Sequence, residues 1–377
     1  MSKSLDEFAE AKLATLQQRN LKRTVTETER LGTVDVLRGG KRLISFSCND
    51  YLNLSQHPDV KAAAIAATQN LGAGSGASRL VTGNHALFAT LEAKLAKLKG
   101  TQAACVFGSG YLANSGIIPA LIGEDDLVCV DELSHACIHA GSRLSKGAVH
   151  IFRHNNMDHL LDVLFKHRSK HPHALIVTDR VFSMDGDLAP VSALSDIADE
   201  HDAWLMTDDA HGIGVVGASP GRVALQMGTL SKAIGGYGGY LCASQAVIDL
   251  IRTRCRTFIY STGLPPGVVA AAIAALDVIA ADPEFAARPL NKAKAFTRLL
   301  DLKEAESPIV PIVIGDTERT LAAARMLEDE GFLVVPIRPP TVPEGMARLR
   351  ITFSAAHNDA DIERLADIIK TRILDAT

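Results

Sequence analysis

Short apolar runs and longer amphipathic segments alternate along the middle of the chain, from about residue 58 to residue 265. Six of the runs have the length of a strand, at residues 103–107, 127–130, 149–152, 174–178, 203–207 and 240–243. Helix-sized segments, such as 86–98 and 192–200, lie between them. This alternation is typical of β-α-β units, so it predicts an α/β fold around a mostly parallel sheet.

The two ends of the chain follow other patterns. Residues 1–45 read as a helix with charged faces and then a short hairpin around Gly39-Gly40, and a helix over 266–281 begins behind two prolines. After about residue 285 the expected order is strand, helix, strand, strand and helix, at 307–314, 317–330, 332–337, 347–354 and 359–373. We therefore expect an N-terminal segment (1–50), a large domain (51–282) and a smaller C-terminal α+β domain (283–377).

Composition excludes several function classes. The chain has 377 residues, 47% of them hydrophobic and 22% charged, which is ample material for a core. Lys and Arg (39) nearly balance Asp and Glu (43) without a basic block, so nucleic-acid binding lacks its electrostatic footprint. The polar N-terminus lacks the apolar core of a secretory signal peptide, and the longest apolar stretch, 268–281, is too short to span a bilayer. We expect a cytoplasmic protein without a membrane partner.

The first group of residues with chemical potential is FGSGYLA at 107–113, which follows a strand and opens a helix. Its glycines let backbone N–H groups approach an anion, and a helix N-terminus favours negative charge. The same residues match the G-x-G-x-x-A dinucleotide pattern, with Asp131 about 20 residues further on. From this motif alone, a nucleotide, another phosphate ligand and a structural turn all remain open.

Three more groups also follow strands, where ligands bind in an open parallel sheet. Asp208-Asp209-Ala210-His211 could suit a metal but lacks further ligands at a recognisable spacing, so no metal site is predicted. Lys232 lies in a run of Gly, Ser and Ala, and shelter from water would favour its neutral, nucleophilic amine. A loop lysine with an ordinary partner is the alternative. His135 just past a strand is weak evidence by itself.

Together these groups meet the needs of one cofactor, pyridoxal 5'-phosphate (PLP). The phosphate would take the glycine-rich helix start, and the aldehyde would take Lys232. A carboxylate at a strand end would keep the ring nitrogen protonated, so that the ring can withdraw electrons.

The chain resembles the α-oxoamine synthase family of fold type I PLP enzymes over nearly its whole length. The matching motifs are NDYL at 49–52, GAGSGASRLVTG at 72–83, LSHA at 133–136, VFSMDGD at 181–187, DDAHG at 208–212, TLSK at 229–232, YST at 260–262 and RLRIT at 348–352. The resemblance implies an acyltransferase whose large domain binds PLP, acting as a homodimer with shared active sites. One departure is segment 215–227, which is shorter than is usual in the family, so residues 223–227 must serve as the strand expected there.

The resemblance also implies roles for single residues. Lys232 would hold the cofactor covalently and then remove the Cα proton of the amino acid. Asp208 would pair with the ring nitrogen, His211 would contact the phenolic oxygen, and His135 would stack over the ring and orient the substrate. The remaining cofactor contacts would come from Gly110, Tyr111, Ser183, Thr229 and, from a neighbouring subunit, Thr262, with Asp179 supporting His135 or the ring oxygen.

Segment 337–343 is most similar to family members that join L-alanine to a pimeloyl thioester, of CoA or of acyl-carrier protein, in biotin biosynthesis. Arg350 would grip the alanine carboxylate through two parallel hydrogen bonds. The acyl side would be lined by Arg23, Asn49, Arg338 and Thr341. Glycine C-acetyltransferase (2-amino-3-ketobutyrate ligase) is the nearest alternative, followed by 5-aminolevulinate synthase and serine palmitoyltransferase. An NAD-binding oxidoreductase would leave Lys232, Asp208 and Arg350 unexplained.

Overall fold

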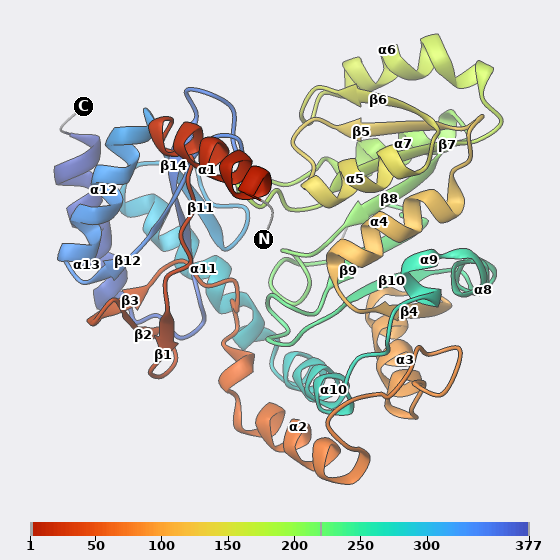
Figure 1. The fold of residues 1–377 in the computed structure, drawn as a ribbon, viewed down its shortest axis with the longest axis horizontal. Helices are drawn as coiled ribbons and strands as arrows, with labels where there is room; N and C mark the ends of the chain where they lie inside the picture. Colours follow the sequence, from red (N-terminus) through yellow and green to blue (C-terminus); the bar gives the residue numbers. More distant parts are fainter. Residues whose placement is uncertain (1–2, 219–220, 376–377) are drawn as a thin grey trace. The chain divides into compact units, whose positions relative to one another are not determined.

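The computed structural model describes residues 3–218 and 221–375, which form two compact units (Figure 1). The larger unit spans 49–309 and 353–356, and the smaller one takes the chain up to Cys48, Val310–Thr352 and the residues from His357 onward. The division expected at 282 differs from this grouping, because α11 (Pro283–Leu299) belongs to the larger unit. There its residues Phe285 and Ala286 pack against the hydrophobic core.

A seven-stranded sheet forms the centre of the larger unit, with the order β4-β10-β9-β8-β7-β5-β6. The strands are β4 Ala103–Phe107, β5 Leu127–Asp131, β6 Ala148–Phe152, β7 Ala174–Asp179, β8 Trp204–Asp208, β9 Leu225–Thr229 and β10 Gly239–Ala243. The pairs from β9 to β6 are parallel, and β10 runs antiparallel to both its neighbours. The predicted α/β fold with a mostly parallel sheet is therefore confirmed.

The strand expected at 223–227 lies two residues further along the chain, as β9. Its register is set on both sides, because Met227 pairs with Asp208 of β8 and Thr229 pairs with Gly239 of β10. The shift places Thr229 at the carboxyl end of the strand, three residues before Lys232.

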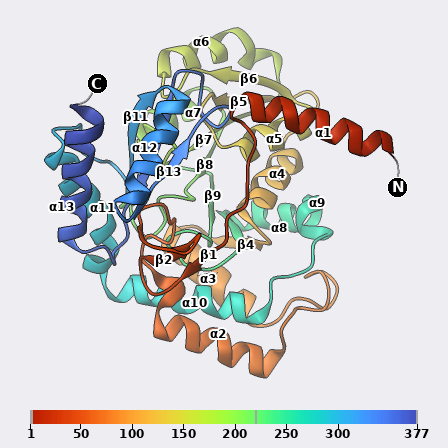
Figure 2. The ribbon, with the colours of Figure 1, turned by 60° about the vertical axis from the view of Figure 1, so that its left-hand side comes forward.

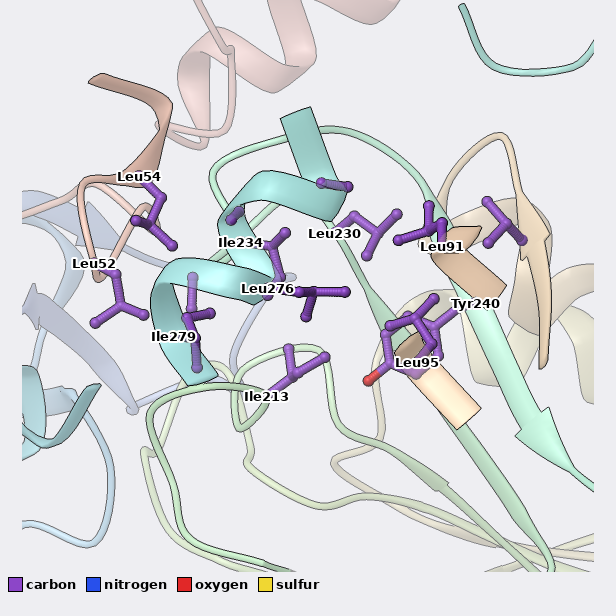
Figure 3. Close-up of a cluster of buried hydrophobic side chains, with 14 of the residues drawn as sticks. Leu52, Leu54, Leu91, Leu95, Ile213, Leu230, Ile234, Tyr240, Leu276 and Ile279 are labelled. Atoms are coloured by element: carbon purple, nitrogen blue, oxygen red, sulfur yellow. The ribbon is translucent and has the colours of Figure 1, made fainter. Parts of the chain in front are cut away.

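Helices cover both faces of this sheet, because successive strand residues point to opposite sides. In β4, Ala104 and Val106 enter one core cluster, whereas Cys105 and Phe107 enter another. The first cluster packs under α2 (Pro58–Leu71), α3 (Leu87–Lys99) and α10 (Pro266–Ala281). Figure 3 shows its side chains, and α2 lies beside α10 in Figures 1 and 2.

The opposite face is covered by α4 (Gly110–Leu121), α5 (Ala136–Leu144), α8 (Gln245–Arg254) and α9 (Arg256–Ile259). Helices α6 (Met157–His167) and α7 (Val191–Glu200) enclose a further cluster with the side chains of β5, β7 and β8 that point away from α4. Burial on both faces explains why the central strands are mainly apolar before the polar residues at their carboxyl ends.

The smaller unit contains two sheets, with orders β1-β2-β3-β12 and β11-β14-β13. Its strands are β1 Thr28–Arg30, β2 Asp35–Arg38, β3 Lys41–Ser45, β11 Ile309–Gly315, β12 Phe332–Leu333, β13 Val335–Ile337 and β14 Ala347–Thr352. Its α-helices are α1 Lys3–Gln18, α12 Thr317–Asp329 and α13 Asp359–Ile369.

The strand expected at 332–337 is in fact two strands that join different sheets. Phe332 pairs in parallel with Ile44 of β3, and Val335 pairs in antiparallel fashion with Arg350 of β14. A hydrophobicity pattern cannot distinguish such a change of partner from one continuous strand. Across residues 3–218 and 221–375, no helix combines the length and the apolar character that crossing a bilayer requires.

Candidate active site

Three buried carboxylates end neighbouring parallel strands of the large sheet: Asp131 on β5, Asp179 on β7 and Asp208 on β8. The register pairs Asp179 with Asp208, so these two side chains share one edge of the sheet. Burial raises the pKa of both groups, and the charge of Asp208 raises the pKa of Asp179 further. A cation bound at this edge would relieve the cost of burying these charges.

Asp208 is held by neutral donors. Its Oδ2 accepts a hydrogen bond from Asn114 Nδ2 at 2.7 Å, and its Oδ1 accepts one from the backbone N–H of Ala210 at 2.9 Å. The Oδ1 atom of Asn114 is buried and has no partner among the described residues. A buried carboxylate that forms no ion pair within residues 3–218 and 221–375, beside the unpaired amide oxygen of Asn114, fits the protonated ring nitrogen of PLP.

Asp209, the next residue, has a separate role. Its carboxylate pairs with Arg180, whose Nη1 lies 3.0 Å from Oδ1, and with the amine of Lys99. All three side chains are at least nine-tenths buried. Of the two neighbouring aspartates, Asp208 therefore lies beside Asn114, and Asp209 forms ion pairs with two buried cations.

This ion cluster borders a cavity of about 840 Å³ in the larger unit. The cavity is also lined by residues of the short 215–227 segment itself, such as Val215 and Val223. Among the described residues, its lining includes neither Lys232 nor Asp208 nor His211. The short segment thus borders a space separate from the predicted cofactor residues.

We expect Asp209→Asn to lower the free energy of unfolding by about 3–5 kcal/mol, because it leaves two buried cations without their counter-charge. Thermal unfolding monitored by circular dichroism measures the effect. Asp199→Asn is the matched control, since Asp199 pairs with the exposed Arg222 and should cost less than about 1 kcal/mol. Equal losses of unfolding free energy in the two variants would show that the buried ion cluster stabilises the protein no more than the exposed ion pair does.

His211 is fixed by a buried tyrosine. Tyr51 is fully buried, and its hydroxyl lies 2.6 Å from Nδ1 of His211 and 3.4 Å from Oδ1 of Asn49. These contacts bring Asn49, predicted to face the acyl group, and His211 to the same hydroxyl. From the sequence, Tyr51 was predicted only as part of the NDYL motif, although a tyrosine within a polar motif could have indicated such a link.

His135 is the N-cap residue of α5. Its backbone N–H donates to Oδ2 of Asp179 at 2.8 Å, and its Nδ1 accepts the N–H of Cys137 at 3.3 Å. The residue is exposed to solvent, so its ring is open to a ligand. Asp179 therefore positions the backbone of His135.

The start of α4 has the geometry of an anion site. Ser109 caps the helix by accepting the N–H of Leu112, while the N–H groups of Gly110 and Tyr111 have no carbonyl one turn earlier. A Cβ atom at Gly110 would lie 3.4 Å from Cβ of Thr229, an ordinary van der Waals distance, so the threonine lies beside the helix terminus. Backbone N–H groups and a hydroxyl are thus gathered where a phosphate would bind.

Lys232 is half-buried in a tight turn behind β9. The Lys232 carbonyl accepts the N–H of Gly235 at 2.8 Å. Gly235 has a φ of +70°, and a Cβ there would lie 2.3 Å from the backbone nitrogen of Ser55. Only glycine permits this turn, which holds the lysine near the ends of β8 and β9.

The remaining two cofactor candidates lie on loops of the larger unit. Ser183 is half-buried in the 181–188 turn, whose ends pair through Val181 and Leu188. Thr262 is exposed and pairs with Ser78 through an isolated bridge.

Four of the predicted substrate residues belong to the smaller unit. Nη2 of Arg23 donates to Oγ1 of Thr341 at 3.0 Å, so these two residues are in contact. Arg338 instead donates to the backbone carbonyls of Asn20 at 2.8 Å and Lys22 at 3.3 Å. Arg350 is buried on β14. The structure thus brings Arg23, Arg338 and Thr341 to one region.

The sequence patterns predicted no role for three of these residues, Asn114, Arg180 and Lys99. Asn114 carried a usable signal, because it is a polar residue on the buried side of an otherwise apolar helix. Arg180 and Lys99 lie 81 positions apart and meet only through Asp209, so no local pattern links them. Within residues 3–218 and 221–375, no group of three or more His, Cys, Asp or Glu side chains could hold a metal ion.

Comparison with known proteins identifies the family. Residues 41–369 match the model of the family described as aminotransferase class I and II. The chain is 60% identical to a putative 8-amino-7-oxononanoate synthase from Parvibaculum lavamentivorans, over 98% of each chain. It is 57% identical to the 8-amino-7-oxononanoate synthase of Beijerinckia indica, over 97% of each.

Solved structures agree with this result. A serine palmitoyltransferase from S. paucimobilis with PLP and myriocin bound superposes with a TM-score of 0.92 and 28% identity, over 99% of each chain. The 8-amino-7-oxononanoate synthase of Francisella tularensis gives a TM-score of 0.75 and 25% identity, over 89% of this chain and 98% of that one. The chain therefore belongs to the class I and II aminotransferase family, as a PLP-dependent α-oxoamine synthase of fold type I that groups with proteins named 8-amino-7-oxononanoate synthase.

Proposed function

We infer that this protein joins L-alanine to a pimeloyl thioester, giving 8-amino-7-oxononanoate, CO2 and the free thiol, a step of biotin biosynthesis. The observation that carries this inference is the identity of 57–60%, over nearly the full length, with relatives that have this name. The site geometry supplies an anion cradle, a buried carboxylate and a half-buried lysine for the cofactor.

When bound, PLP supplies an electron sink for the negative charge that develops at the amino acid's Cα atom. Asp208 pairs with the ring nitrogen and holds a proton there, and the Asn114 amide keeps that carboxylate in place. His211, oriented by Tyr51, donates toward the ring's phenolic oxygen. Lys232 would hold the cofactor's aldehyde, and its free amine would take the proton from Cα.

The other contacts bind and orient. The N–H groups of Gly110 and Tyr111, with the hydroxyl of Thr229, hold the phosphate, and Ser183 contacts the cofactor. His135 covers the ring and orients the amino acid. Arg350 grips the alanine carboxylate, and Asn49 joins the acyl-side residues.

We further propose a homodimer, in which Thr262 reaches the phosphate of the neighbouring subunit. Large apolar side chains of the larger unit are exposed to solvent, namely Ile65, Leu71, Leu80, Val81, Tyr111, Tyr237 and Tyr260. A partner subunit typically covers exposed apolar side chains that adjoin one another, so these residues are the candidates for the contact. Analytical ultracentrifugation tests this proposal. The cytoplasmic location and the absence of membrane and nucleic-acid partners stay predictions.

Serine palmitoyltransferase and glycine C-acetyltransferase are the competing functions. The high TM-score with a serine palmitoyltransferase favours the former only weakly, because backbone similarity does not determine the substrate. The decisive assay offers L-alanine, glycine and L-serine, each with pimeloyl, acetyl and palmitoyl thioesters, and measures CO2 and product. The proposal requires that L-alanine with a pimeloyl thioester gives the highest kcat/KM.

Arg338 tests how the pimeloyl chain is recognised. The distal carboxylate of the pimeloyl chain needs a cation. Arg338→Ala should therefore weaken binding of the pimeloyl donor by about 1.5–3 kcal/mol, seen as a raised KM for that donor. The KM for L-alanine, which depends on Arg350, should change little. The matched measurement uses a heptanoyl thioester, which has the same length and no carboxylate.

Two outcomes separate the roles of Arg338. The wild type should prefer the pimeloyl donor, and the variant should lose most of that preference. Equal losses with both donors would assign Arg338 to its bonds with the carbonyls of Asn20 and Lys22, a structural role. Arg23, in contact with Thr341, would then be the next candidate.

A further inference from the structure

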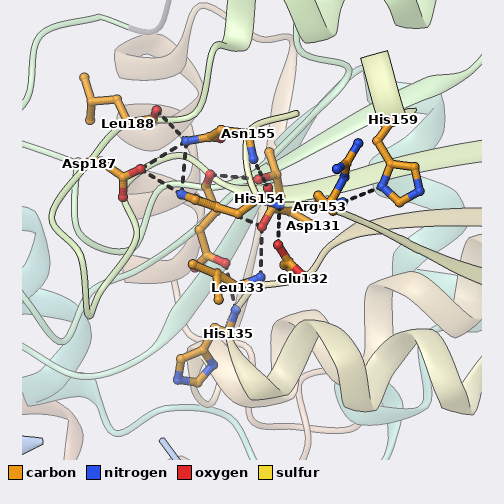
Figure 4. A network of polar contacts seen from close by, with 12 residues as sticks. Asp131, Glu132, Leu133, His135, Arg153, His154, Asn155, His159, Asp187 and Leu188 are labelled. Atoms are coloured by element: carbon orange, nitrogen blue, oxygen red, sulfur yellow. Dashed lines mark hydrogen bonds and ion pairs between the residues drawn. The ribbon is translucent and has the colours of Figure 1, made fainter. Parts of the chain in front are cut away.

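His154, which follows β6, lies between two carboxylates, Asp131 at the end of β5 and Asp187 in the 181–188 turn (Figure 4). Its Nδ1 atom is 3.1 Å from Oδ1 of Asp131, and its Nε2 atom is 2.8 Å from Oδ2 of Asp187. The edge of Phe182 packs against the ring, with 4.3 Å between the ring centroids. This histidine has no part in the function proposed above.

Both nitrogens of His154 face carboxylate oxygens, which favours an imidazole that donates from both. Nε2 also lies 3.3 Å from Nδ2 of Asn155, a longer contact than the 2.8 Å to Oδ2 of Asp187. A neutral imidazole donates from only one nitrogen, whereas the imidazolium donates from both. Burial by itself lowers the pKa of His154, but the hydrogen bonds to Asp131 and Asp187 outweigh it and raise the pKa to about 10. Glu132 faces the same residue, since its Oε1 accepts the backbone N–H of His154.

On one side, the contact with Asp131 connects His154 to the turn that precedes His135. Oδ1 of Asp131, the atom that faces His154, also accepts the backbone N–H of Leu133 at 2.9 Å. The carbonyl of Asp131 accepts the N–H of Ser134 at 3.1 Å. These bonds shape the turn that ends at His135, which Asp179 holds from the other side.

On the other side, the contact with Asp187 connects His154 to the 181–188 turn that contains Ser183. The carbonyl of Asp187 accepts the N–H of Phe182 at 3.1 Å, which closes the 181–188 turn around Ser183. Asn155, adjacent to His154, donates to Oδ2 of Asp187 at 3.1 Å and to the carbonyl of Leu188 at 3.2 Å. The end of β6 thus holds the base of this turn.

We propose that His154 is a positioning residue: its imidazolium ties the end of β5 to the 181–188 turn and so fixes the two loops that carry His135 and Ser183. The proposal rests on the function proposed above for what those two residues contact. It assigns to His154 no contact with substrate or cofactor.

The first test concerns the charge and needs neither substrate nor cofactor. In the histidine-labelled protein, the imidazole NMR signal that is lost in His154→Gln should remain that of an imidazolium at pH 8. Because the raised pKa belongs to the folded state, the stabilisation is complete below the unfolded pKa of about 6.5 and is lost as the pH rises toward about 10. The Tm difference between wild type and His154→Gln should therefore be largest below pH 6.5 and shrink above it.

The second test concerns positioning. His154→Gln and Asp187→Asn should each lower kcat by about 10–100-fold, as expected for a small misplacement of reacting groups, with KM values within about 3-fold. The circular dichroism induced in bound PLP, which reports the ring's surroundings, should change in both variants. His159→Gln is the control: its Nδ1 accepts only the N–H of Arg153, and it should match the wild type.

Three results would overturn the proposal: a His154 signal that titrates near pH 6.5, a kcat in both variants equal to that of His159→Gln, or an unchanged induced circular dichroism. If His154→Gln fails to fold, Asp187→Asn and the wild-type titration still decide. A different substrate preference would refute the proposed function but leave the NMR and circular dichroism results valid.

Discussion

Lys232→Ala is expected to lose nearly all turnover while the protein still binds PLP. The proposed phosphate donors at Gly110, Tyr111 and Thr229 are separate from the lysine, so they remain in the variant. Proton transfer by a positioned side chain alone contributes about 10²–10⁴-fold, so the rate of CO2 release should fall by at least that factor. Borohydride reduction followed by intact-mass measurement should attach the cofactor to the wild type and not to the variant.

Lys94→Ala is the matched control, because Lys94 is a half-exposed lysine of the same unit that pairs with Asp277. It should keep the wild-type rate and the covalent cofactor. Substantial turnover by Lys232→Ala would refute the role of Lys232 in proton transfer. Loss of all PLP binding would instead place the cofactor's main contacts on the lysine.

Asp208→Asn is expected to slow the exchange of the Cα proton of L-alanine by about 10²–10⁴-fold. The substitution keeps the shape and the contact with Asn114 but removes the charge that holds a proton on the ring nitrogen. Loss of one member of a buried ion pair costs about 3–5 kcal/mol, which corresponds to that factor. Exchange in D2O, followed by proton NMR, measures the step without the thioester.

The PLP content of Asp208→Asn should change less than its exchange rate, because the phosphate contacts are intact. Asp277→Asn, on the exposed side of α10, should behave as the wild type. An unchanged exchange rate in Asp208→Asn would mean that another group pairs with the ring nitrogen.

Much of the larger unit follows from local patterns. Strands such as β4 and helices such as α10 lie where the alternation of apolar and polar residues placed them. These predictions succeed because a strand buried on both faces must be apolar throughout, and because prolines mark a helix start. The predicted strand bounds were less accurate where pairing with neighbouring strands sets them. This is the case at β9 and at the division of 332–337 into two strands.

In the candidate site, too, some features follow from local sequence and others depend on the tertiary structure. The sequence by itself determined the family, the cofactor and the residues at the strand ends, because motifs such as TLSK and DDAHG carry their chemistry within a few positions. Only the tertiary structure decided which carboxylate of Asp208-Asp209 meets Asn114 and which meets Arg180 and Lys99. It likewise placed the His154 imidazole between Asp131 and Asp187. These partners lie from 23 to 110 positions apart, and a pairing at such separation depends on strand order and register, which no local pattern encodes.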